Sequence, residues 1–200
     1  MKIVLATSNH GKVKEIKDFY KDYEILALNE IMSPFEIEEN GQSFKENALI
    51  KVKAVAKKLN LNEFIVLSDD SGISVDIFDG VPGIYSARFS GENATDASNR
   101  AKLISMLKEK NIKKTPAYYT ACIAIATKFG DFTTHGFMHG SVIDEERGNN
   151  GFGYDFMFIP KGFDNTTAEL SLDIKLQISH RSNGLRLMGV VLKNLKKYYD

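Results

Sequence analysis

The sequence predicts an α/β fold built on a mixed β-sheet. In the first half of the chain, short apolar runs typical of strands alternate with apolar residues at helical spacing. In the second half, two long β-rich runs follow each other across a glycine-containing turn, the pattern of a hairpin. Strands that alternate with helices and then give way to antiparallel strands predict a single α/β domain with a mixed sheet.

The composition is that of one globular domain without a strong net charge. The 200 residues are 43% hydrophobic, enough for a domain that buries roughly 70% of its extended surface. Lys plus Arg and Asp plus Glu both number 26, so there is no net field that would concentrate a nucleic acid. The single cysteine, Cys122, lies in an apolar run and excludes a disulfide framework or a CxxC metal site.

We expect a cytoplasmic protein with no membrane contact. The apolar start of the chain is too short for a signal peptide, and no apolar run approaches about 18 residues. No low-complexity linker or internal repeat divides the chain, so residues 1–200 are expected to form a single domain.

The first half of the chain carries clear helix-start signals. Ser43 followed by Glu46 forms a capping box, and Thr95 is placed to cap a later helix. The elements expected in order are a strand at 2–6, a helix at 13–20, a strand at 23–28, a helix from 44 to 59, strands at 64–67 and 73–78, and a helix ending near 108.

The second half is expected to be mainly β-structure until its end. Residues 118–129 and 132–143 predict a long hairpin joined at Gly130-Asp131, and residues 156–159 predict a further strand. Apolar residues at helical spacing from Leu185 to Leu195 predict a last amphipathic helix, with residues 178–184 expected to precede it.

Two adjacent carboxylates, Asp69 and Asp70, close the apolar run at 64–67. Neighbouring side chains of a regular strand point to opposite faces, so both acids serve one centre only if the strand breaks there. We expect Ser71-Gly72 to supply that break. Such oxygens suit Mg²⁺, which is usually held by one or two carboxylates together with substrate phosphates. Taken alone, the pair is more often a solvated strand end.

A polar turn between the first strand and the first helix is a candidate phosphate site. Backbone amides and hydroxyls at a helix N-terminus favour an anion, and a lysine there adds a point charge. It is not a Walker A loop, because Ala6 stands where that motif has its first glycine. An ordinary strand-to-helix turn is the alternative. The candidate residues are Thr7, Ser8, Asn9, His10, Gly11 and Lys12.

Two further acids and a lysine complete the candidate metal and phosphate site. If Glu38 or Glu39 faces Asp70, their oxygens form a cage for a cation, and Lys51 neutralises phosphate charge. The ordinary alternative for all three is a solvated surface position next to a helix.

Two segments in the last third are candidates for binding a base. Phe152 and Tyr154 lie in a glycine-rich turn, where aromatic rings either stack on a flat base or belong to the core. Arg181 offers two parallel donors that match O6 and N7 of a 6-oxopurine, and His180 is placed to join it. The alternative is a helix capped by Ser179 or Ser182 with an exposed arginine nearby.

Taken together, these motifs resemble the inosine triphosphate pyrophosphatase family. The matching segments run in the family's order through nearly the whole chain: Leu-Ala-Thr-Ser-Asn-His-Gly-Lys at 5–12, Phe-Lys-Glu-Asn-Ala at 44–48 with Lys51, Ser-Asp-Asp-Ser-Gly at 68–72, Pro-Gly-Ile-Tyr-Ser-Ala-Arg at 82–88, Gly-Phe-Gly-Tyr-Asp at 151–155 and Ser-His-Arg at 179–181. The chain departs from the family pattern at Ser8, where the family commonly has glycine, and after Arg181, where Ser-Asn-Gly replaces a glycine.

The resemblance implies an elongated mixed-sheet fold with two lobes flanking a nucleotide-binding cleft, and a homodimer. It also implies Mg²⁺-dependent hydrolysis of ITP, dITP and XTP to monophosphate and pyrophosphate, which removes non-standard purines from the nucleotide pool. By the same resemblance Asp70 is the catalytic residue, acting as a base or as a carboxylate that orients water, and Glu38, Glu39 and Asp70 are metal ligands. The substrate-binding residues that it implies are Thr7, Ser8, Asn9, His10, Gly11, Lys12, Lys51, Ser71, Phe152, Gly153, Tyr154, Asp155, Lys175, His180 and Arg181.

Two alternative functions remain open at this point. A pyrophosphatase of the septum-inhibitor type has a related cleft but prefers modified pyrimidine nucleotides; Ser-His-Arg and Phe-Gly-Tyr-Asp argue against it. A non-catalytic nucleotide sensor would bind the triphosphate without cleaving it. The set of carboxylates argues against a sensor, because acids repel a phosphate chain unless a metal intervenes.

Overall fold

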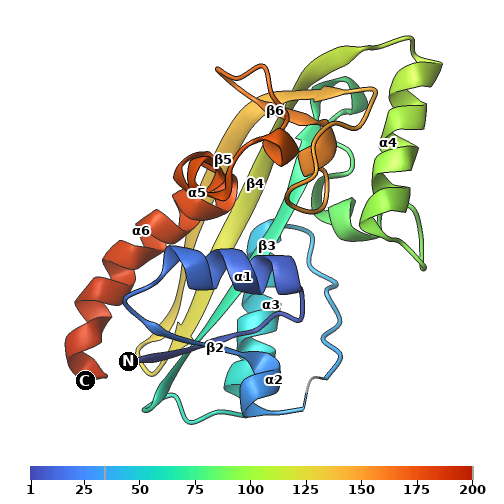
Figure 1. Cartoon of the computed structure of the whole chain (residues 1–200). Coiled ribbons are helices and arrows are strands. Elements are labelled where there is room, and N and C mark those ends of the chain that lie inside the picture. The colour runs from blue at the N-terminus through green and yellow to red at the C-terminus, as the bar shows by residue number, and fades with distance from the viewer. Residues whose placement is uncertain (34, 200) are drawn as a thin grey trace. The chain divides into compact units, whose positions relative to one another are not determined.

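The computed structural model describes residues 1–33 and 35–199 and contains a six-stranded mixed sheet (Figure 1). The strand order is β2-β1-β3-β4-β5-β6, with β1 parallel to β2 and β3, and β5 antiparallel to β6. The strands are β1 (Lys2–Leu5), β2 (Glu24–Ala27), β3 (Phe64–Val75), β4 (Lys114–Thr127), β5 (Gly130–Ile143) and β6 (Phe158–Pro160). The predicted mixed-sheet α/β fold is confirmed.

Helices follow the parallel strands and also close the chain. They are α1 (His10–Phe19), α2 (Leu28–Ile31), α3 (Phe44–Ala56), α4 (Asp96–Glu109), α5 (Leu172–Ile178) and α6 (His180–Leu195). The predicted helix caps are confirmed: the Ser43 hydroxyl accepts a hydrogen bond from the Glu46 amide, and the Thr95 hydroxyl accepts one from the Ser98 amide. The predicted capping box at Ser43 is only half formed, because the Glu46 carboxylate accepts from the Gln42 amide. No helix among the described residues is long and apolar enough to cross a membrane.

The chain divides into two compact units. Unit 1 comprises Met1–Asp70, Ala121–Gly136 and Arg181–Asp200, and unit 2 comprises Ser71–Thr120 and Phe137–His180. The long strands β3, β4 and β5 each contribute residues to both units. Neither unit is therefore a continuous piece of the sequence.

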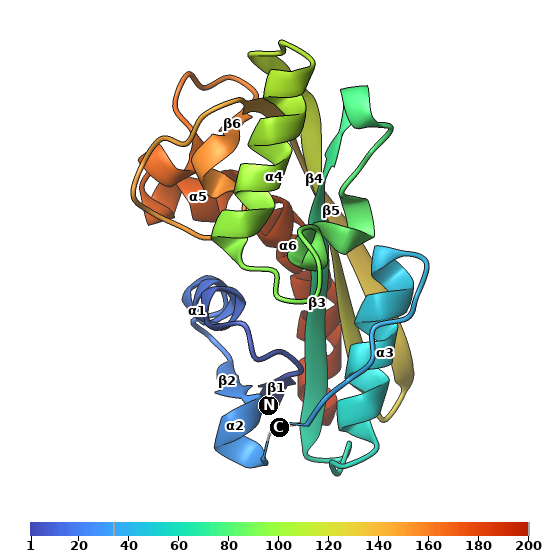
Figure 2. The same ribbon diagram turned by 90° about the vertical axis from the view of Figure 1, so that its right-hand side faces the viewer.

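In unit 1, helices pack on both faces of the sheet. Ile65 and Leu67 of β3 pack in one cluster with apolar residues of α1 and α6, whereas Val66 packs in another with Ala48 and Val52 of α3. Figure 2 shows α1 and α3 on opposite sides of β3. Because side chains alternate along a strand, odd-numbered residues of this part of β3 face α1 and α6, and even-numbered residues face α3.

In unit 2, the core lies between α4 and the strands. Leu103 and Leu107 of α4 pack in one cluster with Phe158 of β6 and with residues from the parts of β3, β4 and β5 that belong to unit 2. The Tyr119 ring meets the Phe158 ring edge-on, with centroids 4.8 Å apart. This cluster supports the glycine-rich turn at 148–155, because Tyr154 of the turn and Met157 just after it both belong to the cluster.

Three expectations about local structure are wrong. The two short strands around an acidic turn are one strand, β3, which runs through Asp69 and Asp70 without a break. The final helix begins at His180, so Ser-His-Arg stands at its first turn and not in a loop before it. The hairpin turns at residues 128–129, between β4 and β5, and Gly130 already belongs to β5 with a φ of 114°.

Candidate functional site

The continuity of β3 separates the two adjacent aspartates. Asp69 extends the face of Ile65 and Leu67, and Asp70 extends the face of Val66 and Ser68. The partners of each side chain agree with this alternation, since Asp69 pairs with Lys12 of α1 and Asp70 pairs with Lys51 of α3. The two carboxylates therefore serve two different clusters, which corrects the expectation of one shared centre.

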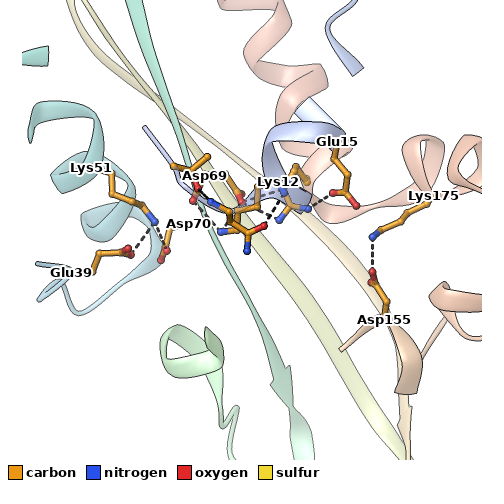
Figure 3. A network of polar contacts seen from close by, with 11 residues as sticks. Lys12, Glu15, Glu39, Lys51, Asp69, Asp70, Asp155 and Lys175 are labelled. Atoms are coloured by element: carbon orange, nitrogen blue, oxygen red, sulfur yellow. Dashed lines mark hydrogen bonds and ion pairs between the residues drawn. The ribbon is translucent and has the colours of Figure 1, made fainter. Parts of the chain in front are cut away.

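The first cluster is formed by Glu39, Lys51 and Asp70 (Figure 3). Lys51 lies on the buried stripe of α3 with Ala48 and Val52, and its ammonium is 2.8 Å from Asp70 Oδ1 and 2.9 Å from Glu39 Oε2. On the same face of β3, the Ser68 hydroxyl donates to the Ala48 carbonyl at 2.7 Å and ties the strand to the helix. The Lys51 ammonium thus pairs with two carboxylates from separate segments of the chain.

Burial and the neighbouring charges act in opposite directions on the pKa values of Asp70 and Lys51. Burial raises the pKa of Asp70 above its ordinary value, although the charges of Lys51 and Lys12 pull it down. Burial also disfavours the charged form of Lys51, but the carboxylates of Asp70 and Glu39 outweigh it and raise the Lys51 pKa. Asp70 Oδ2 is buried and has no hydrogen-bond partner among residues 1–33 and 35–199. An oxygen left in this state suits a further ligand.

The residues of this cluster fit a divalent cation shared with phosphate. No group of three or more acidic, histidine or cysteine side chains in the described part of the chain is arranged to hold a metal ion alone. Mg²⁺ usually takes only one or two carboxylates and completes its shell with water and substrate phosphates. Glu39 and Asp70 supply such a pair. Glu38 is exposed, and Glu39 is the member of the two that shares Lys51 with Asp70.

The second cluster surrounds the buried guanidinium of Arg181. Asp69 Oδ2 accepts from Arg181 Nε at 3.1 Å and from Nη2 at 3.0 Å, and Glu15 accepts from Nη1. Lys12 adds its ammonium 3.0 Å from Asp69 Oδ2. The pKa of Arg181 is raised, because the charges of Asp69 and Glu15 outweigh its burial. The alternative of an exposed arginine beside a helix cap is therefore wrong.

The predicted phosphate turn forms the start of α1 in unit 1. Asn9 caps the helix by accepting from the Lys12 amide at 3.0 Å, and the Thr7 hydroxyl accepts from the Asn9 amide at 3.2 Å. Ser8, Asn9 and His10 are exposed, while Thr7, Gly11 and Lys12 are half-buried. Burial lowers the pKa of Lys12, although the Asp69 carboxylate opposes this shift. The turn therefore presents polar groups and one cation beside a helix N-terminus.

The third cluster lies in unit 2 and joins α5 to the glycine-rich turn. The Lys175 ammonium is 2.5 Å from Asp155 Oδ2 (Figure 3). It also lies 4.7 Å from the centroid of the Phe152 ring. Asp155 also accepts from the Phe152 amide at 2.9 Å. Both charged side chains are buried, whereas Phe152 is half-buried. The pair holds an aromatic ring in place next to a desolvated charge.

The rest of the turn is fixed by contacts that sequence reasoning missed. The Gly153 amide donates to Asp96 at 2.8 Å, and its carbonyl accepts from Arg100 at 2.9 Å; both side chains belong to α4. Tyr154 is buried, and its hydroxyl donates to the Ser86 carbonyl at 2.8 Å. For Tyr154 the ordinary interpretation as a core residue is confirmed.

His180 is the last residue of unit 2 in the sequence, and its side chain stacks on an aromatic ring. Its imidazole lies parallel to the Tyr119 ring, with centroids 4.4 Å apart and an interplanar angle of 7°. Ser71, the other predicted substrate residue near the unit boundary, is half-buried on β3. Tyr119 and Glu15 were not predicted, although Glu15 lies one helical turn after Lys12 and shares its side of α1.

Comparison with known proteins places this geometry in a family. The Ham1 family model matches residues 3–190. Two proteins named dITP/XTP pyrophosphatase, from Campylobacter hominis and Campylobacter fetus, are 68% and 65% identical to the chain, with 100% of both chains covered. The structure of a Staphylococcus aureus Ham1 protein superposes with a TM-score of 0.83 at 37% identity, over 97% of this chain and 99% of that one. A Coxiella burnetii HAM1 protein, at 35% identity with the same coverage, gives a TM-score of 0.84. With profile, sequence and fold in agreement over nearly its full length, the chain belongs to the Ham1 family.

Proposed function

We propose that this chain is a nucleoside triphosphate pyrophosphohydrolase that converts ITP, dITP and XTP to the monophosphate and pyrophosphate. The relatives at 68% and 65% identity carry the name dITP/XTP pyrophosphatase over their whole length. The structural observation that supports the reaction is the pair of carboxylates of Glu39 and Asp70 around Lys51, with one buried Asp70 oxygen left for a ligand.

The reaction requires that water attack the α-phosphorus while the bond to the β-phosphate oxygen breaks. We propose that Asp70 orients this water and accepts its proton, because burial makes its carboxylate a stronger base than an ordinary aspartate. Lys51 stays protonated beside it and offsets charge on the phosphate oxygens. Water then forms the new P–O bond, and pyrophosphate leaves with the electrons of the old one.

Glu39 and Asp70 are the proposed ligands of Mg²⁺, with Glu38 as the less favoured alternative to Glu39. When bound, Mg²⁺ would neutralise phosphate oxygens and lower the pKa of a coordinated water. The triphosphate would be held by Thr7, Ser8, Asn9, His10, Gly11, Lys12, Lys51 and Ser71.

Base recognition is assigned to the residues of the glycine-rich turn and to Ser-His-Arg. Phe152 offers a ring for stacking, and the pair of Lys175 and Asp155 fixes both the ring and a buried charge beside it. We propose that His180 and Arg181 read the 6-oxo group and N7, with Asp69 and Glu15 holding the Arg181 guanidinium. In adenine, an amino group takes the place of the 6-oxo group and would face these donors. Each buried donor left unpaired in this way costs about 1–3 kcal/mol. Gly153 and Tyr154 shape the turn.

The family resemblance further supports a homodimer and a cytoplasmic location as proposals. A sedimentation measurement at micromolar concentration tests the first, and fractionation of cells that express the tagged chain tests the second.

The decisive experiment measures products, not only turnover. Purified protein is incubated with ITP, XTP, ATP and dUTP in the presence and absence of Mg²⁺, and pyrophosphate is assayed separately from orthophosphate. We expect pyrophosphate from ITP and XTP, far less from ATP and dUTP, and no reaction without the metal. Preference for dUTP would support the pyrimidine-specific alternative, and binding of ITP without cleavage would support the sensor.

A further inference from the structure

Asn47 occupies a buried position in α3 that the proposed reaction does not use. Its side chain is fully buried, one helical turn before Lys51 on the same stripe of the helix. Its Oδ1 accepts a hydrogen bond from the Gly41 amide at 2.9 Å. Gly41 follows Glu39 by two residues, so this bond fixes the segment that carries the Glu39 carboxylate.

The contact between this segment and α3 is close. A Cβ added to Gly41 would lie 2.7 Å from Asn47 Oδ1 and 2.7 Å from Glu46 Cβ, distances that real Cβ atoms essentially never show. The Gln42 amide also donates to Glu46 Oε2 at 2.7 Å. The segment at 39–42 is thus drawn against the first turn of α3, and only a glycine at position 41 allows this approach.

A second asparagine in the chain shows what an ordinary structural version of this contact looks like. Asn99 stands at the same position of α4 as Asn47 in α3, four residues after the capping residue, and its Oδ1 accepts from the Ser90 amide at 2.7 Å. The Asn99 amide group also donates to the Ala87 carbonyl at 3.1 Å, so both halves of the side chain are used. Asn47 Nδ2, by contrast, is buried with no partner within the ranges 1–33 and 35–199.

We propose that Asn47 is a positioning residue for Glu39, and that its contact with Gly41 sets the affinity of the Glu39–Asp70 pair for a divalent cation. This inference rests on the proposed function. The Glu39 carboxylate lies 2.9 Å from the Lys51 ammonium, and the backbone next to it is anchored by Asn47 and Glu46. Residues that orient a metal ligand typically change metal affinity by about 10- to 100-fold when they are removed.

The test compares Asn47→Ala with Asn99→Ala, the same truncation at the matched position in unit 2. For Asn47→Ala we expect the Mg²⁺ concentration for half-maximal ITP hydrolysis to rise at least about tenfold, with kcat restored at saturating Mg²⁺. Asn99→Ala should leave that concentration within about twofold of the wild-type value, although both variants lose a buried carboxamide and some thermal stability. Equal increases of this Mg²⁺ concentration in the two variants would show that Asn47 has a purely structural role.

Two readouts do not depend on activity. Hydrogen exchange of the Gly41 amide should accelerate in Asn47→Ala and remain slow in Asn47→Asp, which keeps the acceptor. Binding of Mn²⁺ to the protein with pyrophosphate, followed by calorimetry, should weaken in Asn47→Ala and not in Asn99→Ala.

Gly41→Ala disturbs the same contact without changing Asn47, and it covers the case in which Asn47→Ala does not fold. It should reproduce the loss of Mn²⁺ affinity. The proposal would be overturned by unchanged exchange of the Gly41 amide in Asn47→Ala together with unchanged Mn²⁺ affinity in both Asn47→Ala and Gly41→Ala. If wild-type protein shows no metal-dependent hydrolysis at all, the proposed function fails instead, while the exchange data still report on the contact itself.

Discussion

At the residue scale, Asp70 differs from its neighbour Asp69 in how its charge is balanced. Asp69 forms ion pairs with both Lys12 and Arg181, whereas Asp70 forms its ion pair with Lys51 and shares that lysine with Glu39. A carboxylate that accepts several cationic donors is a weak base, and one raised in pKa by burial is a stronger base. This asymmetry is the reason why we propose Asp70, and not Asp69, as the proton acceptor.

The first prediction concerns the variant Asp70→Asn. The amide keeps the shape of the side chain but cannot accept a proton, so we expect kcat for ITP to fall by about 10²- to 10⁴-fold. Lys51 retains Glu39 as a partner, so the variant should remain folded. Steady-state kinetics and circular dichroism check both parts, and near-normal turnover in a folded variant would remove Asp70 from its role.

A second prediction uses the lowered pKa of Lys12. Burial disfavours its charged form, so Lys12 loses its proton at a pH below the ordinary lysine range, whereas Lys51, with its raised pKa, keeps its proton. The charge on Lys12 is present below this pKa and is lost as the pH rises through it, so KM for ITP should increase on the alkaline side. In Lys12→Arg the alkaline increase should move to higher pH. An unchanged profile would exclude Lys12 as its source.

At the scale of elements, β3 determines which residues can act together. The apolar run, the position of both acids and the capped helix α3 could be predicted from the sequence. The continuity of the strand could not, because Ser71-Gly72 has the local composition of a turn while pairing inside the sheet keeps it extended. Because the strand is continuous, the alternation of its side chains places Asp69 and Asp70 on opposite faces of the sheet.

The third prediction separates the roles of the two aspartates. Asp69→Asn removes the charge that faces Lys12 and Arg181 in a fully buried position, so we expect the free energy of unfolding to fall by about 3 kcal/mol. Asp70→Asn, on the opposite face, should lose activity with a much smaller loss of stability. Urea denaturation of both variants gives the comparison, and equal losses of stability would contradict it.

The start of α6 shows the same limit of sequence reasoning. From the sequence, residues 178–184 are expected to precede the final helix, yet Gly184 lies inside α6. A Cβ at this position would lie 2.9 Å from Ile123 Cγ1 of β4, so the glycine serves close packing of helix on sheet. Local propensity could not reveal this, because the neighbour lies about 60 residues away along the chain.

At the scale of the whole molecule, the motifs that the sequence presents one after another are sorted into two units. The candidate phosphate and metal residues from Thr7 to Asp70 belong to unit 1, as does Arg181. The other candidate residues belong to unit 2: Ser71, Phe152, Gly153, Tyr154, Asp155, Lys175 and His180. The identity of these motifs could be read from the sequence because each depends on local residue types. Their sorting depends on strands that pass through both units, and on partners such as Glu15 with Arg181, which only tertiary packing brings together.

Substitutions around the glycine-rich turn of unit 2 and substitutions around Asp70 of unit 1 should change different kinetic constants. Lys175→Met removes the cation from Asp155 and from the Phe152 ring, which are assigned to the base, and leaves Asp70 and Lys51 in place. We therefore expect KM for ITP to rise by about tenfold or more, the equivalent of one lost charge-assisted contact, with a smaller effect on kcat and a lower preference for ITP over ATP.

Lys113→Met is the control for this prediction, because it removes a lysine paired with Asp144 in the same unit, at an exposed position assigned no role in binding. It should leave both constants close to those of the wild type. If Lys175→Met instead lowered kcat as Asp70→Asn does and left the preference between ITP and ATP unchanged, the assignment of Lys175, Asp155 and Phe152 to base recognition would have to be abandoned. The chemistry assigned to unit 1 would stand, since no charge around Asp70 depends on Lys175.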